Sequence, residues 1–163
     1  MSDSNITLRP ALPADVPRIL ELIKALALYE KEPDAVVATE ADIHRALFSE
    51  NAKAFAILCD IDATNVGFAL YFYNFSTWRG KHGIFLEDLF VEPEHRGRGA
   101  GLAMLKALAQ KAVQEGCERF EWNVLDWNTP SIQFYESVGA VPMSEWIGYR
   151  LSGEALATFA STQ

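Results

Sequence analysis

The spacing of hydrophobic positions changes several times along this chain of 163 residues. After a short alternating strand at 6–9, apolar residues recur at helical spacing and predict two amphipathic helices, at 13–29 and 39–48. Thr39 is a suitable N-cap for the second helix. The pattern then becomes rich in aromatic and aliphatic residues, which is typical of strands. The three strands it predicts run at 54–58, 66–75 and 83–91.

The second half of the chain predicts a β-α-β unit with a helical tail. A helix at 101–113 ends near Gly116, and a short helix follows a further strand. The order of elements predicts an α/β fold of the α+β type, with a mixed, mostly antiparallel central sheet and helices packed on it, in a single domain spanning 1–163. The remaining predicted elements are the strand at 120–125, the helix at 129–138 and a last strand at 146–151.

Composition and charge exclude several classes of partner. The formal net charge of −8 argues against nucleic acid and against an anionic membrane surface. An acidic surface suits a cationic substrate, although many proteins use such charge only for solubility. No apolar run approaches the roughly 18–20 residues of a membrane span, and the polar start lacks the layout of a secretory signal. We therefore expect a cytoplasmic protein.

Neither the cysteines nor the histidines indicate a metal site. Cys59 and Cys117 lie in apolar stretches and form no CxxC pair, so we expect buried free thiols in preference to a disulfide. The three histidines have no spacing that resembles metal ligands, and we expect no metal.

The strongest local signal is a glycine-rich turn between a strand and a helix, in the run from Arg96 to Gly101. Alternate glycines let the backbone approach a ligand, and the free amides and dipole of the following helix attract a phosphate or pyrophosphate. Two arginines, Arg96 and Arg98, add positive charge. The turn fits neither a dinucleotide fingerprint, because Leu102 stands where a glycine is needed, nor a Walker loop. An ordinary glycine-rich turn remains the simpler alternative.

A second motif lies downstream of the strand at 120–125. Asn128, Ser131 and Tyr135 recur at i, i+3 and i+7, so they share one face of a short helix whose first turn contains Pro130. A tyrosine has an ordinary pKa of about 10 and stays protonated at neutral pH, so its hydroxyl has a proton to donate. A solvated polar face would show the same spacing.

The two motifs together resemble the GNAT superfamily of N-acetyltransferases. These enzymes use acetyl-CoA and share a fold with helices on both faces of the sheet. The resemblance implies that acetyl-CoA is the co-substrate, that Tyr135 is the general acid, and that the strand before the turn pairs with the pantetheine arm. The cofactor-binding residues implied in this way are Leu89, Phe90, Val91, Arg96, Gly97, Arg98, Gly99, Ala100, Gly101, Asn128, Ser131 and Tyr135.

Within that superfamily the chain resembles the diamine acetyltransferases, which act on spermidine, spermine or thialysine. Ser76-Thr77-Trp78 is similar to the thialysine branch, whereas the spermidine/spermine branch carries an acidic residue at the position of Ser76. The resemblance implies that Glu87 is the general base, acting through water because a carboxylate is too weak to deprotonate an ammonium unaided. The matching segments are 28–30, 75–81, 86–91 and 125–128.

The acceptor amine is expected to meet Glu30, Trp78, Glu87 and Asp88. Adjacent strand residues point to opposite faces, so Glu87 and Asp88 should not act as a pair unless a bulge intervenes. Asp88 fits a structural hydrogen-bonding role equally well, Glu30 fits an ordinary helix-end carboxylate, and Trp78 fits a core position or a stack on an alkylammonium.

The predicted activity is direct transfer of an acetyl group from acetyl-CoA to a primary amine of a small cationic substrate. Two alternatives use the same residues, namely another acceptor such as an amino acid or an amino-sugar antibiotic, and a non-catalytic sensor of acetyl-CoA. The presence of both Tyr135 and Glu87 disfavours the sensor, which needs neither. The resemblance also implies a homodimer.

Overall fold

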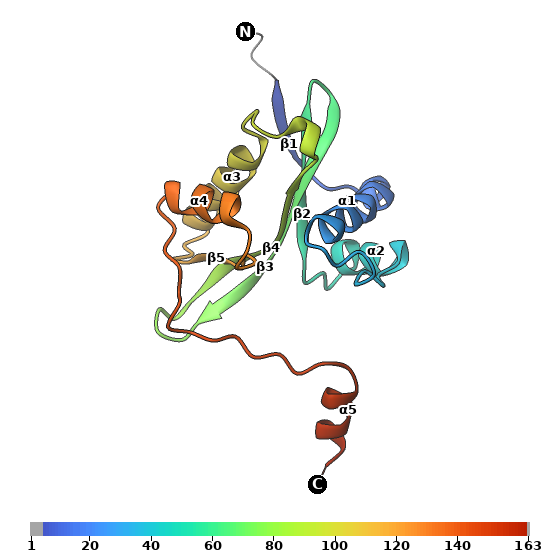
Figure 1. The fold of residues 1–163 in the computed structure, drawn as a ribbon, viewed down its shortest axis with the longest axis vertical. Coiled ribbons are helices and arrows are strands. Elements are labelled where there is room, and N and C mark those ends of the chain that lie inside the picture. Colours follow the sequence, from blue (N-terminus) through green and yellow to red (C-terminus); the bar gives the residue numbers. More distant parts are fainter. Residues whose placement is uncertain (1–4, 163) are drawn as a thin grey trace. The chain divides into compact units, whose positions relative to one another are not determined.

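A computed structural model describes residues 5–162, which divide into two compact units with their boundary between Leu125 and Asp126. The first unit holds a five-stranded sheet and three α-helices (Figure 1). Its strands are β1 (Ile6–Pro10), β2 (Phe55–Ile61), β3 (Thr64–Ser76), β4 (Lys81–Val91) and β5 (Phe120–Trp122). Its helices are α1 (Val16–Tyr29), α2 (Glu40–Phe48) and α3 (Ala100–Gln114), with 3-10 turns η1 (Pro13–Asp15) and η2 (Pro93–His95).

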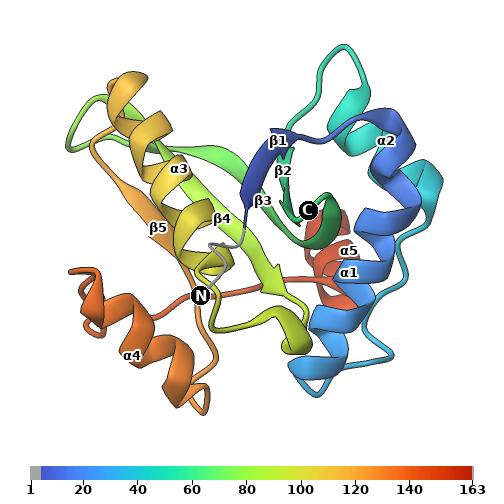
Figure 2. The same cartoon turned by 90° about the horizontal axis from the view of Figure 1, so that it is seen from above.

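The sheet has the predicted mixed, mostly antiparallel character. Its strand order is β1-β2-β3-β4-β5, and every neighbouring pair is antiparallel except β4 and β5, which are parallel. Helices α1 and α2 lie on one side of the sheet and α3 lies on the other (Figure 2). The α/β fold with helices on both faces is therefore confirmed.

The core forms where α1 packs on the middle of the sheet. Ile19 and Leu22, one turn apart on α1, meet Leu58 of β2 and Phe68 of β3, and each of these four side chains is at most 1% exposed. Thr39 caps α2 as predicted, since its hydroxyl accepts the backbone N–H of Asp42 at 3.2 Å.

The pairing of β3 with β4 is interrupted at one residue. Tyr71 pairs with Leu86 and Leu70 pairs with Asp88, so Glu87 is an extra residue in β4, a β-bulge. Strand β5 pairs with β4 only from Ile84 to Leu86, just before this bulge. A bulge bends its strand, which explains why β5 ends at Trp122 and is shorter than the predicted strand at 120–125.

Both cysteines are free thiols, as predicted. Cys59 is fully buried in β2, and burial raises the pKa of its thiol to about 11. Cys117 is half-buried. Neither thiol lies in the electropositive setting that activates a nucleophilic cysteine.

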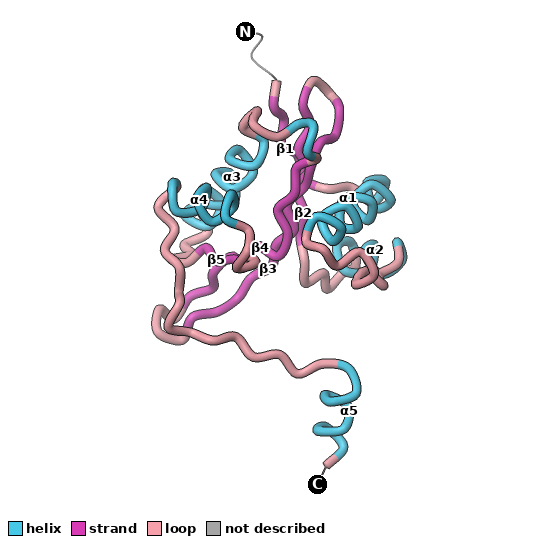
Figure 3. Tube along the Cα trace, viewed as in Figure 1, coloured by secondary structure: helices cyan, strands magenta, loops and turns pink. Residues whose placement is uncertain are grey.

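The second unit contains α4 (Thr129–Ser137) and α5 (Gly153–Ser161). The prediction of a strand at 146–151 was wrong, because this segment is a loop between the two helices (Figure 3). A strand needs a neighbour that accepts its backbone hydrogen bonds, and no strand within residues 5–162 pairs with this segment. Its apolar side chains remain exposed, and Tyr149 is 96% exposed.

Candidate active site

The turn between β4 and α3 has the backbone of an anion-binding loop. Gly97 and Gly99 adopt φ values of 75° and 89°, a left-handed conformation that side chains with a Cβ rarely take. Gly99 is the N-cap of α3, so the helix begins at Ala100 directly after the turn. The first amides of a helix have no partner within it and carry its positive dipole end. The loop therefore offers a run of amide donors to an anion.

The left-handed conformation that explains Gly97 and Gly99 does not explain the glycine at position 101. Its φ is not in the left-handed region, and a Cβ built on it meets no described atom within 4 Å. Neither backbone conformation nor packing in the described chain requires glycine here, although a glycine in a helix costs about 1 kcal/mol relative to alanine. A ligand lying against the first turn of α3 would supply the requirement, and this fits the predicted pyrophosphate.

The two arginines of the loop are placed differently. Arg98 is exposed, and its guanidinium lies 3.4 Å from the carboxylate of Asp62. The side chain of Arg96 instead turns back toward the end of β4, where its Nε donates a hydrogen bond to the carbonyl of Val91 at 2.9 Å. The sequence predicted positive charge from both residues but did not predict this difference.

The part of β4 after the bulge has an unpaired edge. Its residues Leu89, Phe90 and Val91 pair with β3 on one side, while β5 has already ended at the level of Leu86. Within residues 5–162, no other strand pairs with this second edge. Unpaired backbone groups at a sheet edge are a template for an extended ligand, as the predicted pairing with a pantetheine arm requires.

Three carboxylates, one at the end of α1 and two in β4, lie near enough for charge to act between them. Glu30 is the C-cap of α1, where Lys31 in the left-handed conformation ends the helix. Glu87 is the exposed bulge residue, and Asp88 follows it half-buried. Burial and then the charge of Glu87 raise the pKa of Glu30. Burial, followed by the charges of Glu87 and Glu30, raises the pKa of Asp88 to about 7.

The bulge brings together two residues that a regular strand would separate. The charge of Glu87 raises the pKa of Asp88, and the bulge that the prediction required does intervene in β4. No residue between 5 and 162 donates a hydrogen bond to the Asp88 carboxylate, which disfavours the purely structural role considered for it. A group of like charges without a cationic partner attracts a cation.

The other predicted residues of the site belong to the second unit. Asn128 is the N-cap of α4, and its side-chain oxygen accepts the backbone N–H of Ser131 at 3.4 Å. Asn128 is 8% exposed, while Ser131 and Tyr135 are half-buried on the same helix. The structure thus confirms the short helix and shows why asparagine suits the N-cap position before it.

Trp78 and Ser76 lie at the far end of the β3–β4 hairpin. Trp78 is 79% exposed in the turn after β3. Glu87 lies about 20 Å along β4 from the start of that strand, at a strand rise of about 3.4 Å per residue. Within the first unit, the structure therefore does not bring Trp78 beside the carboxylates.

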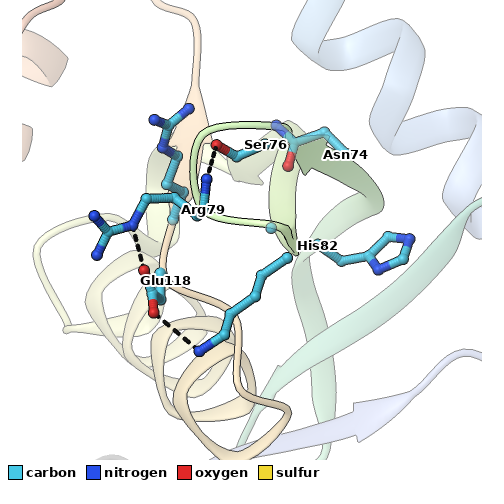
Figure 4. A pocket seen from close by; sticks show the side chains of 8 residues that line it. Asn74, Ser76, Arg79, His82 and Glu118 are labelled. Carbon is cyan, nitrogen blue, oxygen red and sulfur yellow. Dashed lines mark hydrogen bonds and ion pairs between the residues drawn. The ribbon is translucent and has the colours of Figure 1, made fainter.

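Ser76 is buried in the structure of this turn. It is 8% exposed, and its Oγ accepts the backbone N–H of Arg79 at 3.2 Å (Figure 4). Arg79 and Lys81 both form ion pairs with Glu118 beside it. The pocket drawn here is lined by Asn74, Ser76, Arg79, Lys81, His82, Gly83, Glu118 and Arg119. Ser76 therefore shapes the hairpin turn, and an effect on acceptor choice would act through that turn.

One group of possible metal ligands was missed by the sequence reasoning, which considered only the spacing of histidines. Glu92, Glu94 and His95 offer ligand atoms within 4.8 Å of one another around η2. Glu92 is already paired with Arg18 at 2.8 Å. The absence of a metal stays a prediction.

Comparison with known proteins identifies the family. Residues 18–140 match the model of the acetyltransferase (GNAT) family. Thialysine N-epsilon-acetyltransferase of Sus scrofa is 34% identical over 168 residues, which cover 96% of this chain and 98% of that protein. Spermidine/spermine N(1)-acetyltransferase-like protein 1 of Homo sapiens is 36% identical over 151 residues, covering 88% of this chain and 22% of that protein.

A solved structure shares the fold. An integron cassette protein from V. cholerae aligns with a TM-score of 0.81 and 27% identity, over 96% of this chain and 98% of its own. The glycine loop, the unpaired edge of β4 and the helix that begins at Thr129 all lie within the matched residues. This chain belongs to the acetyltransferase (GNAT) family.

Proposed function

We propose that this acetyl-CoA-dependent N-acetyltransferase acetylates a primary amine of a small substrate with two positive charges, of the thialysine, diamine or polyamine kind. The observation that carries the proposal is the group formed by Glu30, Glu87 and Asp88. The three carboxylates lie beside the β4 edge proposed for the thioester. One amine of the substrate can be held near Glu30 while the other is presented at Glu87 and Asp88.

The cofactor would be held by the loop and the adjoining strand edge. The pyrophosphate would be bound by the loop amides from Arg96 to Gly101, of which that of Arg96 also donates to the Pro93 carbonyl at 3.3 Å. The pantetheine arm would lie along the edge of β4 from Leu89 to Val91, where the Val91 carbonyl also accepts Arg96 Nε. Asn128 and Ser131 would complete its binding from α4. When bound, acetyl-CoA supplies the acetyl thioester. A backbone amide near Phe90 or Val91 would polarise the thioester carbonyl.

The chain's own acid and base groups would move two protons. Glu87 would accept the ammonium proton through a water molecule, and burial of the bound amine would favour loss of that proton. A pKa of about 7 lets Asp88 exchange a proton at neutral pH, which suits a partner in this relay. Tyr135 would protonate the departing thiolate. Direct transfer needs no covalent intermediate on the enzyme.

Two observations favour a thialysine-like acceptor over a polyamine. The relative from Sus scrofa is a thialysine N-epsilon-acetyltransferase matched over nearly its whole length. In addition, this chain has serine at position 76, the residue similar to the thialysine branch. We propose thialysine and related amines as better acceptors than spermidine.

The test is acetyl-CoA turnover, measured as free thiol release against thialysine, lysine, spermidine, putrescine and an amino-sugar antibiotic. We expect thialysine to give the highest kcat/KM, and Glu87→Gln to lower kcat by ~10²–10⁴-fold without weakening acetyl-CoA binding. A substrate with one cationic amine turned over as well as those with two would contradict the role given to the carboxylate group. Binding of acetyl-CoA without turnover of any amine would refute the proposed acceptor class.

We also propose that the protein is a cytoplasmic homodimer. The segment from 141 to 151 exposes several large apolar side chains, among them Trp146 at 65% and Ile147 at 79%. Its alternating pattern is that of a strand, and a second copy of the chain would offer the missing neighbour. Light scattering after size exclusion tests this proposal, and Ile147→Asp should produce monomers.

Other partners are expected to be small molecules only. The net charge of −8 supports the absence of nucleic-acid and membrane-surface binding. Among residues 5–162, no helix is long and apolar enough to cross a membrane.

A further inference from the structure

The side chain of Arg96 is held by contacts within the first unit. Its Nε donates to the Val91 carbonyl at 2.9 Å, and its guanidinium carbon lies 4.7 Å from the ring centroid of Tyr29 and 5.5 Å from that of Phe90. A guanidinium above an aromatic face is attracted by the ring's negative face. Arg96 is therefore anchored to three residues besides any ligand of the loop.

These partners come from two different elements. Phe90 and Val91 form the end of β4, whereas Tyr29 is the last residue of α1. Arg96 itself follows η2 at the start of the glycine loop. Its side chain therefore links the loop, the strand beside it and the C-terminal end of the first helix.

The end of α1 carries a residue of the carboxylate group. Glu30 follows Tyr29 directly, and its backbone N–H donates to the carbonyl of Leu26 at 2.9 Å. The helix is then closed by the N–H of Glu32, which donates to the carbonyl of Ala27 at 2.9 Å. Because Glu30 is adjacent to the ring that Arg96 covers, a displaced Tyr29 displaces Glu30 as well.

We propose that Arg96 is a positioning residue that fixes the C-terminal turn of α1, and with it Glu30, on the cofactor loop. The part that concerns the amine rests on the function proposed above. Occupation of the loop would then favour one position of Glu30, so the second cationic amine would bind more tightly once the loop is ordered.

The chemistry favours arginine for this link. A planar guanidinium can stack on a ring with its face while it donates an in-plane hydrogen bond to a carbonyl. The ammonium of a lysine is a point charge and has no planar face with which to stack. Arg96→Lys should therefore weaken the link, and Tyr29→Phe should preserve it because the ring remains.

The test compares Arg96→Met with Arg98→Met, which removes the same charge from the same loop. We expect Arg96→Met to raise the KM of a dicationic amine about 5- to 20-fold while changing the Kd of acetyl-CoA less than about threefold. Arg98→Met should instead raise the Kd of acetyl-CoA and change the KM of the dicationic amine little. Tyr29→Leu should raise the KM of the dicationic amine as Arg96→Met does, and Tyr29→Phe should have the KM of the wild type. Equal effects of Arg96→Met on amines with one and two charges would overturn the link to Glu30.

A second measurement does not depend on turnover. Hydrogen exchange at the amides of 30–32 should be faster in Arg96→Met than in Arg98→Met or the wild type, because the turn of α1 loses its anchor. Unchanged exchange, or a rise in the Kd of acetyl-CoA as large as that of Arg98→Met, would overturn the proposal. Faster exchange in a protein that acetylates no amine would support the positioning role and refute the proposed function instead.

Discussion

Replacing Asp88 with asparagine should stabilise this protein at alkaline pH and impair its function. Burial and the neighbouring charges of Glu87 and Glu30 raise the pKa of Asp88 to about 7, from an ordinary value of 3.8. Between pH 4 and 7, the Asp88 carboxyl is therefore protonated in the folded state and ionised in the unfolded chain. The stabilisation is fully present below pH 4 and is lost as the pH rises through 7.

The size of the effect follows from the two pKa values. Each pKa unit corresponds to about 1.4 kcal/mol, so the difference between about 7 and 3.8 amounts to about 4 kcal/mol in the free energy of unfolding. Asparagine has the shape of the protonated acid and carries no charge at any pH. Asp88→Asn should therefore match the wild type near pH 4 and exceed it by about 2–4 kcal/mol at pH 8.

Urea denaturation of both proteins from pH 4 to 8, at constant ionic strength, measures this difference. Asp34→Asn, at an exposed position, is the matched control and should change stability by less than about 0.5 kcal/mol. The reasoning is refuted when Asp88→Asn is less stable than the wild type at pH 8, or when the two proteins depend on pH in the same way. The stabilised variant should also bind a dicationic amine about tenfold more weakly, a trade of function for stability.

Three further variants test other parts of the molecule. Tyr135→Phe should lower kcat by ~10²–10⁴-fold with little change in acetyl-CoA affinity, and an unchanged kcat would remove Tyr135 from the mechanism. Gly101→Val should weaken acetyl-CoA binding at least about 100-fold. Its melting temperature should stay near normal, because a Cβ at this position meets no described atom within 4 Å. Normal affinity in calorimetry would contradict the loop assignment. Phe68→Ala should cost about 3–5 kcal/mol in urea denaturation, whereas Phe75→Ala, at 57% exposure, should cost less than about 1 kcal/mol.

The local features of this protein were determined by its sequence. Hydrophobic spacing predicted α1, α2 and α3 to within a few residues. The backbone hydrogen bonds of a helix join residues close in sequence, so its hydrophobic period can be recognised from neighbouring positions. The glycine loop could also be read from the sequence, since the left-handed conformation of Gly97 and Gly99 is a property of single residues. The motif at 128–135 was recognisable because its spacing lies on one short helix.

Only the tertiary structure decided where strands pair and which charges meet. The pattern at 146–151 is that of a strand, but a strand depends on a partner distant in sequence, and the described chain provides none. The bulge at Glu87 depends in the same way on the register of β4 against β3. It brings Glu87 and Asp88 together beside the end of α1 and leaves the next part of β4 open. Register and proximity arise from contacts between residues far apart in the chain, so no local pattern can contain them.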